Sequence, residues 1–468
     1  MADNIGSQTP PHIALFPSAG MGHLTPFLRL ASMLLSNNCM VTLFTAQPTV
    51  SDTESTHTSF FLSTHPQAKN IKYQIIPSHV QHSNPTTDDP FFLQFAAISH
   101  HVHLLHPLIS SSSPPFSAIF SDFILASSIT QAAVDLGIPN YIVITTSAKF
   151  LSLMAYLPIL TSDPAKLSST SFEVNIPGLT PLSISSIPSP FFNPNHLFTA
   201  QIVSNTSAFS EAKGILMNTF ESFEPETLAA VNSGRVLSNL PPILPIGPLE
   251  PFELKKDQLQ SLTWLDNQPM ESVVYVSFGS RTAMSKDQIR ELADGLERNG
   301  CRFLWVIKTS KVDKEDKDEL KDLLGSSFLE RTQNKGIVVK GWVNQQEILA
   351  HPAIGGFINH CGWNSVMEAA SGGVPLLAWP QHGDQRVNAE VVEKAGLGIW
   401  ERDWGWGVER LVKGEEIGRK IGELMENEKL RDRARKVGEE ARKARGTDGS
   451  SDKVLMGVIE VVNQKRRN

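Results

Sequence analysis

Hydrogen-bond donors gather where a predicted strand turns into a helix, in the run from residue 355 to residue 370. Gly355 to Asn359 is short, apolar and bounded by glycine, which is typical of a buried strand. Asn364 and Ser365 are good helix-start residues, so we expect a helix to begin there. Free backbone N–H groups and the dipole of a helix N-terminus favour phosphate, and His360, Asn364 and Ser365 add side-chain donors. The run therefore predicts an anion site.

Three further side chains suit the hydroxyl groups of sugars. Glu368 lies one helical turn beyond Asn364 on the same face, and its carboxylate suits ribose hydroxyls because it would repel phosphate. Asp384 and Gln385 end a polar loop after the apolar run Val374 to Trp379, which predicts a second buried strand. Both residues then lie at the carboxyl end of a strand, where open α/β sheets bind ligands. A carboxylate beside an amide can form several hydrogen bonds to adjacent sugar hydroxyls.

A histidine in the first half of the chain has the position and chemistry of a general base. Gly20-Met21-Gly22-His23 follows a predicted strand, His12 to Pro17, and opens a helix. The loop lacks the third glycine of a dinucleotide fingerprint, which argues against NAD binding. Histidine titrates near neutrality, so His23 suits removal of a proton from a weakly acidic hydroxyl group. Asp122 ends the predicted strand Ala118 to Ser121 and could bond the other ring nitrogen, although a helix-capping His and an unrelated Asp fit the same residues.

The 44 residues from Trp342 to Gln385 form one continuous motif, WVNQQEILAHPAIGGFINHCGWNSVMEAASGGVPLLAWPQHGDQ. They resemble the plant secondary product glycosyltransferase signature of plant family 1 UDP-glycosyltransferases. A match of this length is far more specific than a single Gly-rich loop. The resemblance implies that Trp342 stacks on uracil, that Gln345 reaches the ribose, and that the anion site holds the diphosphate. It also implies that Asp384 and Gln385 bind the sugar, and that His23 and Asp122 form a catalytic dyad.

Two positions depart from the usual form of the signature, and one further loop adds a residue to the predicted binding site for the sugar donor. Asn344 stands where Pro is frequent and Asn359 where Thr or Ser is frequent, and neither change removes a presumed ligand group. The run Ser277 to Thr282 follows a predicted strand, and Ser280 could donate to the diphosphate from a second anion nest. The predicted donor-binding residues are Ser280, Trp342, Val343, Gln345, His360, Trp363, Asn364, Ser365, Glu368, Asp384 and Gln385.

Short apolar runs alternate with segments of helical period, which predicts an α/β fold with parallel sheets. The pattern restarts at Val273, after the Pro-rich stretch Leu240 to Pro251, which we interpret as a linker. We therefore expect two Rossmann-like domains facing across a cleft, the GT-B fold that the resemblance implies. Residues 1–245 would bind the acceptor and residues 246–450 the UDP-sugar, with residues 451–468 packing back on the first domain.

Composition limits the class of protein. The chain has 468 residues, 41% hydrophobic and 19% charged, which is ordinary for a soluble globular protein of two or three domains. A net charge of −7 argues against a nucleic-acid partner. Three cysteines without a C-x-x-C pair argue against a metal site and a disulfide framework. We find no signal core and no run of about 18 apolar residues, so we expect a cytoplasmic monomer without a membrane span or a resident cofactor.

The acceptor pocket is expected to come from the first half, where aromatic residues are frequent. A flat aromatic acceptor would suit them, although each ring also suits an apolar core. The predicted acceptor-binding residues are Phe91, Phe92, Phe150, Phe191 and Phe192, and Phe95, Met154 and Phe198 are further candidates.

Four short motifs resemble a narrower subgroup, the plant flavonoid C-glycosyltransferases. These motifs are Ser18 to His23, Asp89-Pro90-Phe91, Ser186-Ile187-Pro188 and Pro380 to Gln385. The resemblance implies UDP-glucose as co-substrate and a phloroglucinol-type ring as acceptor, as in phloretin or a 2-hydroxyflavanone. A phenolate also carries negative charge on its ortho carbons, so the binding pose decides whether carbon or oxygen attacks the sugar. We expect inversion at the anomeric carbon.

Three alternatives stay open from the sequence. An O-glucosyltransferase of small phenols would keep every site residue and change only the acceptor pose. A nucleotide-sugar sensor on the same fold would need neither His23 nor Asp122. A nucleotide-sugar epimerase would lack an aromatic acceptor pocket.

Overall fold

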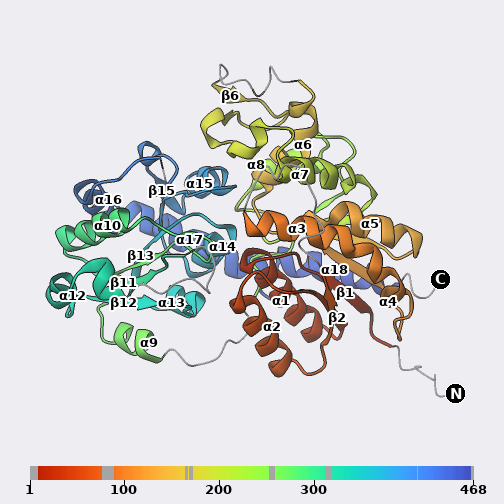
Figure 1. Cartoon of the computed structure of the whole chain (residues 1–468), viewed down its shortest axis with the longest axis horizontal. Coiled ribbons are helices and arrows are strands. Elements are labelled where there is room, and N and C mark those ends of the chain that lie inside the picture. The colour runs from red at the N-terminus through yellow and green to blue at the C-terminus, as the bar shows by residue number, and fades with distance from the viewer. Residues whose placement is uncertain are drawn as a thin grey trace.

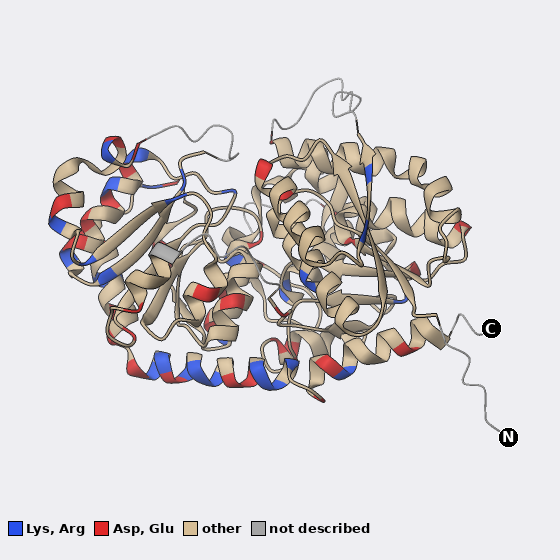
Figure 2. Cartoon of the chain, turned by 90° about the horizontal axis from the view of Figure 1, so that it is seen from below, with Lys and Arg blue, Asp and Glu red and all other residues tan. Residues whose placement is uncertain are grey.

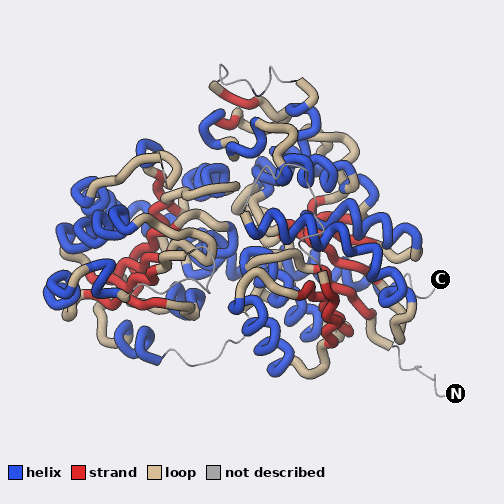
Figure 3. The backbone as a smooth tube through the Cα atoms, in the orientation of Figure 1, coloured by secondary structure: helices blue, strands red, loops and turns tan. Residues whose placement is uncertain are grey.

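The computed structural model describes residues 9–75, 89–163, 167, 172–251, 259–310, 319–407 and 409–464. Two α/β domains lie side by side, and each has a central sheet with helices on both faces (Figures 1 and 3). The predicted fold class, with two Rossmann-like domains, is confirmed.

The first sheet contains, within the described ranges, seven parallel strands in the order β3-β2-β1-β4-β5-β8-β9. They are β1 (His12–Phe16), β2 (Met40–Gln47), β3 (Lys69–Gln74), β4 (Ala118–Asp122), β5 (Asn140–Ile144), β8 (Gly214–Met217) and β9 (Ile243–Pro245). Side chains alternate between the two faces of a strand, so β1 contributes Ile13 and Leu15 to one core and Ala14 and Phe16 to the other. Burial on both faces explains why these strands are continuously apolar.

The helices of this domain cover both faces of the sheet (Figure 3). They are α1 (Met21–Ser36), α2 (Asp52–Thr64), α3 (Pro90–His101), α4 (His106–Ser110), α5 (Ala126–Asp135), α6 (Ala148–Thr161), α7 (Leu197–Ser207) and α8 (Pro225–Asn232). A small antiparallel pair, β6 (Glu173–Val174) and β7 (Leu182–Ser183), lies apart from the sheet. Short 3-10 helices are η2 (Val102–Leu105), η3 (Phe123–Leu125), η5 (Ile184–Ser186), η6 (Ser189–Phe192), η7 (Phe209–Glu211) and, in the second domain, η9 (Arg402–Trp404).

The second sheet repeats the same arrangement with six described strands, in the order β12-β11-β10-β13-β14-β15. They are β10 (Val273–Ser277), β11 (Arg302–Ile307), β12 (Gly336–Lys340), β13 (Ile354–Asn359), β14 (Leu376–Ala378) and β15 (Gly398–Trp400). The helices are α9 (Leu259–Leu265), α10 (Lys286–Asn299), α11 (Leu320–Leu324), α12 (Ser326–Thr332), α13 (Gln345–Ala350), α14 (Trp363–Gly372), α15 (Gln385–Lys394), α16 (Gly414–Glu426) and α17 (Glu428–Arg445).

The last helix, α18 (Ser450–Gln464), returns to the first domain (Figure 1). Leu455, Val458, Ile459 and Val462 share a core with the strands of the first sheet. The preceding helix, α17, carries charges of both signs along its outer face, seen from below in Figure 2. No helix among the described residues is long and apolar enough to cross a membrane.

The linker predicted at Leu240 to Pro251 is wrong in part, because Ile243–Pro245 forms β9. Its Ile243 and Leu244 pair with Ile215 and Leu216 of β8. The proline is tolerated because β9 is the edge strand, so one side of its backbone needs no partner in the sheet. Two helix starts also differ from the prediction: α14 begins at Trp363, and Gln385 is the first residue of α15 rather than part of the loop.

Candidate active site

In each sheet the direction of the strand order reverses beside the first strand. The reversal lies between β1 and β4 in one domain and between β10 and β13 in the other. Ligands of open α/β sheets bind outside the carboxyl ends of the strands at such a reversal. Here the two reversal points face one another across a cavity of about 1330 Å³ that residues of both domains line. His23 and all the predicted donor-binding residues are among those that line it.

The predicted dyad is assembled at the first reversal point. His23 Nδ1 lies 2.8 Å from Asp122 Oδ2, and the other carboxylate oxygen accepts the backbone N–H of Ile124 at 3.0 Å. A carboxylate only accepts, so Nδ1 carries the proton and Nε2 presents a lone pair. The side chain of His23 is 17% exposed, whereas Asp122 is fully buried behind it and does not line the cavity. This arrangement fits a base held in one tautomer by a positioning carboxylate.

The turn before His23 is fixed by a residue that sequence reasoning did not identify. Gly20 has φ 90°, and its N–H donates to Glu54 Oε2 at 2.8 Å. Glu54 also accepts the N–H of Ser51 at 2.9 Å, which caps helix α2. Burial raises the pKa of Glu54, and the bonds from Gly20 and Ser51 oppose that shift. A capping box at the start of α2 was the available signal in the sequence.

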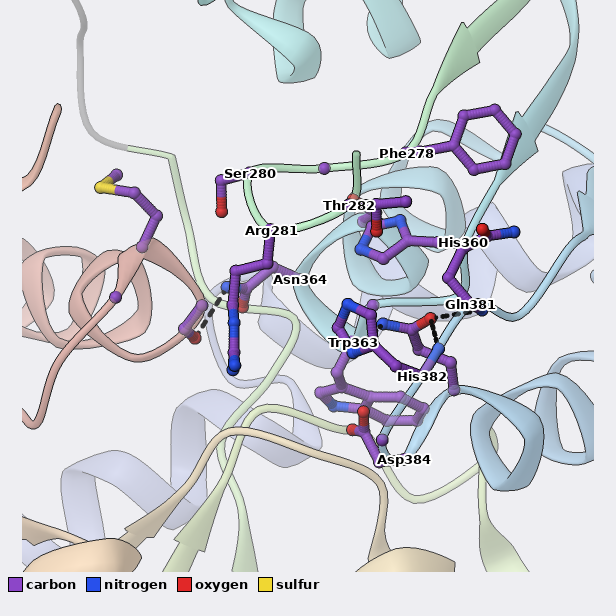
Figure 4. Close-up of a pocket in the computed structure, with 18 of the residues that line it drawn as sticks. Phe278, Ser280, Arg281, Thr282, His360, Trp363, Asn364, Gln381, His382 and Asp384 are labelled. Atoms are coloured by element: carbon purple, nitrogen blue, oxygen red, sulfur yellow. Dashed lines mark hydrogen bonds between the residues drawn. The ribbon is translucent and has the colours of Figure 1, made fainter. Parts of the chain in front are cut away.

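The predicted anion site lies at the second reversal point (Figure 4). The backbone leaves β13, turns at Cys361 with φ 62°, and enters α14 through its N-cap, Gly362. Burial lowers the pKa of His360 to about 3, so the imidazole is neutral at physiological pH. Among the described residues, its buried Nδ1 has no hydrogen-bond partner. Gly279 has φ 75°, and a Cβ there would lie 2.6 Å from the His360 ring. The loop after β10 is thus shaped around this histidine.

Asn364 and Ser280, two further predicted phosphate ligands, lie around this turn (Figure 4). Asn364 Nδ2 donates to the carbonyl of Gly22, 3.0 Å away in the other domain. Ser280 is exposed in the loop that follows β10, and Lys308 Nζ donates to its carbonyl at 2.5 Å. Trp363 is 3% exposed, and its indole N–H donates to the carbonyl of Asn218 at 2.8 Å. Trp363 therefore anchors α14 in the core, although it also contributes to the lining of the cavity.

The residues predicted for ribose and uracil form a connected group. Gln345 Nε2 donates to Ser365 Oγ at 2.8 Å and to Glu368 Oε2 at 2.7 Å. The Tyr275 hydroxyl donates to Gln345 Oε1 at 3.1 Å. Trp342 is 38% exposed and lines the cavity. Val343 beside it is buried at the cavity wall.

Asp384 and Gln385 occupy the end of the cavity beyond β14. Asp384 accepts hydrogen bonds from Thr146 Oγ1 and from Asn388 Nδ2, the latter at 2.9 Å. Burial raises the pKa of Asp384, and these two hydrogen bonds oppose the shift. Gln385 uses its Oε1 to accept the backbone N–H groups of Gln381 at 2.8 Å and His382 at 3.0 Å. Gln385 therefore also fixes the loop that carries Asp384.

Aromatic rings line the cavity beside His23. Phe91, Phe92, Phe150 and Phe192, which were predicted to bind the acceptor, line it, and so do Phe95, Phe123 and Phe198. The His23 ring lies 5.3 Å from the ring of Phe95 and 5.7 Å from that of Phe123, measured between centroids. Phe123 was missed, although it directly follows Asp122.

The prediction for Phe191 is not supported by its position. Phe191 is fully buried and does not line the cavity. It stacks between Phe150 and Phe198, with centroids 6.0 Å and 5.8 Å away, so its faces are covered by other rings. Met154 is likewise fully buried in the core.

Charged and hydroxyl side chains that sequence reasoning missed also line the cavity. Arg281 is paired with Asp89 at 3.2 Å and lies 4.0 Å over the ring of Phe91. Thr146 follows the apolar strand β5, a position that could have marked it as a ligand group at a strand's carboxyl end. Arg29 lies in the middle of α1, and no feature of the sequence around it indicates a binding residue. No group of three or more His, Cys, Asp or Glu side chains in the described residues is arranged to hold a metal ion.

Comparison with known proteins decides the family. Residues 240–401 match the family model described as UDP-glucoronosyl and UDP-glucosyl transferase. The chain is 52% identical over 461 residues to UDP-glycosyltransferase 708C1 of Fagopyrum esculentum, covering 98% of this chain and 97% of that protein. It belongs to the plant family 1 UDP-glycosyltransferases.

Two further relatives of this UDP-glycosyltransferase support the narrower subgroup. The UDP-glycosyltransferase named CGT from Oryza sativa subsp. japonica is 45% identical over 450 residues, which are 95% of each chain. The structure described as LpCGTa in complex with UDP has 45% identity and a TM-score of 0.85, covering 97% of this chain and 99% of that one. The GT-B fold and the resemblance to C-glycosyltransferases are thereby confirmed.

Proposed function

We propose that this UDP-glycosyltransferase transfers glucose from UDP-glucose to a carbon atom of a phloroglucinol-type phenol, with inversion. Phloretin and open 2-hydroxyflavanones are acceptors of this chemical type. The observation that carries the proposal is the 2.8 Å contact between His23 Nδ1 and Asp122 Oδ2 at the edge of a cavity lined by phenylalanines. A nucleotide-sugar sensor has no use for a base oriented in this way.

His23 acts as the general base in this proposal. Its Nε2 takes the proton of an acceptor hydroxyl, and Asp122 stabilises the imidazolium that forms. The rings of Phe95 and Phe123, which flank His23, hold a flat acceptor beside it. An aromatic slot of this kind also argues against an epimerase, which needs no second substrate.

The ring carbon ortho to the phenolate attacks the anomeric carbon of glucose from the face opposite the diphosphate. The new carbon–carbon bond forms as the bond from the anomeric carbon to the diphosphate oxygen breaks, and UDP leaves. The ring carbon then releases its own proton to water, the ring oxygen regains a proton from the His23 imidazolium, and aromaticity returns. The N-terminus of α14 with His360, Asn364 and Ser365 stabilises the charge that develops on the diphosphate.

The donor is held in the order that the signature implies. Trp342 stacks on uracil, Gln345 and Glu368 bind the ribose, and Asp384 with Gln385 binds the glucose hydroxyls. Relatives supply support for the donor, since LpCGTa is described in complex with UDP. A cytoplasmic location and a monomeric state stay predictions from the sequence.

The test is to incubate the protein with UDP-glucose and phloretin and to analyse the products by mass spectrometry before and after acid hydrolysis. The proposal predicts a hexose adduct that resists acid, because a carbon–carbon bond is not hydrolysed. An acid-labile adduct would assign O-glucosylation instead. The His23→Ala protein is the matched control and should give far less adduct than the wild type in the same time.

A further inference from the structure

Arg29 is a buried cation of the first domain that reaches into the donor site of the second. It lies on α1, six residues after His23, and is 5% exposed. A guanidinium is charged at all ordinary pH values, and burying it is costly unless it is paired. Its partners therefore reveal what the residue does.

Those partners lie across the domain boundary. Arg29 Nη2 donates to Glu368 Oε1 and, at 3.2 Å, to Gln346 Oε1. Glu368 is 8% exposed, so both members of the ion pair are buried. In the part of the chain that the structure describes, Arg29 Nε is buried without a hydrogen-bond partner. The pair is thus formed through a single guanidinium nitrogen, Nη2, beside the cavity that both residues line.

Glu368 is held from both sides by these contacts. Arg29 engages Oε1, and Gln345 Nε2 donates to Oε2 at 2.7 Å. A carboxylate has about four acceptor positions, so two remain for hydroxyl groups of a ligand. The contacts with Arg29 and Gln345 fix the orientation of this carboxylate and so the direction of its free lone pairs.

The same contacts join the helix of the base to the helix of the diphosphate site. Asn364 Nδ2 donates to Gly22 O at 3.0 Å near the N-termini of α14 and α1, and the Arg29–Glu368 pair forms a second contact further along both helices. Two contacts fix the direction of one helix against the other, which one contact cannot do. The placement of His23 on α1 is thereby tied to the ribose site.

We propose that Arg29 is a donor-positioning residue supplied by the acceptor domain: it orients Glu368 toward the ribose hydroxyls and locks α1 against α14. This inference rests on the proposed role of Glu368 in binding the ribose. Arg29 acts through Glu368, so its contribution to affinity exists only when the nucleotide carries those hydroxyls.

The test compares binding of UDP and of 2′,3′-dideoxy-UDP to the wild-type, Arg29→Gln and Arg29→Lys proteins by titration calorimetry. Arg29→Gln should weaken UDP about tenfold or more, in line with loss of a charge-assisted contact, and should change the dideoxy nucleotide by less than about twofold. Arg29→Lys keeps the charge but has a shorter side chain than the guanidinium that reaches both Glu368 and Gln346, so it should give an intermediate affinity for UDP. Arg331→Gln, which breaks an exposed pair with Glu297, is the matched control and should bind both nucleotides as the wild type does.

Equal weakening of both nucleotides in Arg29→Gln would overturn the proposal, because it would indicate a merely structural role. Unchanged UDP affinity would overturn it as well. Kinetics provides a second readout: KM for UDP-glucose should rise in Arg29→Gln while KM for the acceptor stays within about twofold. Binding is measured without an acceptor, so failure of the protein to glucosylate phenols would refute the proposed function and leave the nucleotide comparison valid.

Discussion

Asn364 Nδ2 donates to the backbone carbonyl of Gly22 over 3.0 Å, from the first turn of α14 to the residue before His23. The bond links a predicted phosphate ligand of one domain to the turn that presents the base in the other. Movement of either domain would therefore displace the base relative to the donor. A displacement of about 1 Å is enough to reduce the rate about 100-fold, because transfer requires close alignment.

Asp122→Asn should reduce kcat about 100-fold or more while the structure stays folded. The amide can still contact His23 but can favour the wrong tautomer and cannot stabilise the imidazolium. Steady-state kinetics with saturating UDP-glucose measures the effect. Asp135→Asn, on the outer helix α5, is the control and should retain full activity. Equal activity of the Asp122→Asn and wild-type proteins would refute the positioning role.

Gly279→Ala should weaken UDP binding about tenfold or more. A Cβ at this position would lie 2.6 Å from the His360 ring, and the φ of 75° strains any L side chain. The loop after β10 or the histidine must move, and both belong to the diphosphate site. Gly457→Ala is the matched control, since nothing lies within 4 Å of a Cβ there. Calorimetry that gave the same UDP affinity for Gly279→Ala and wild type would show that this loop does not shape the site.

Trp342→Ala should weaken UDP by about 10- to 100-fold, as expected for the loss of a ring stacked on a base. Trp342→Phe keeps an aromatic face and should recover most of the affinity. The exposed ring already lies at the cavity wall, and the His57 ring lies 4.7 Å from it between centroids, at an interplanar angle of 78°. If Trp342→Phe bound UDP as weakly as Trp342→Ala, stacking would not be the source of the affinity.

His360 should make the ligand-free protein less stable as the pH falls from about 6.5 toward 3. Burial lowers the pKa of this histidine from its ordinary value of 6.5 to about 3. In that window the unfolded chain binds a proton that the folded chain does not, so the free energy of unfolding decreases as the pH falls. Urea denaturation at pH 7 and pH 4.5 should show a smaller loss for His360→Gln than for wild type. Equal losses would indicate that His360 is protonated in the folded protein.

Residues at strand ends could be predicted from the sequence, whereas their partners across the cleft could not. His23, Asp122 and Asp384 each follow an apolar run, and parallel sheets bring the carboxyl ends of such runs together. The pairs Arg29–Glu368 and Thr146–Asp384 join residues more than 200 positions apart. Such contacts depend on how the two domains dock, and the local sequence pattern does not determine how they dock.

Aromatic residues show a second limit of prediction from the sequence. Phe191 and Phe192 are neighbours, yet Phe191 is fully buried and Phe192 is 40% exposed at the cavity. Both lie in the short helix η6, whose direction is set by packing against Phe150 and Phe198. Composition predicts a supply of rings but does not distinguish the wall of a pocket from the core behind it.

The central claim is that His23 removes the proton of the acceptor, and the most direct measurement pairs two assays of His23→Ala. One is kcat with UDP-glucose and phloretin, and the other is the Kd for UDP by calorimetry. General-base catalysis predicts that kcat falls about 100- to 10,000-fold while Kd changes less than about threefold. An unchanged kcat, or a parallel loss of UDP binding that accounts for the lost activity, would contradict the role assigned to the His23–Asp122 pair.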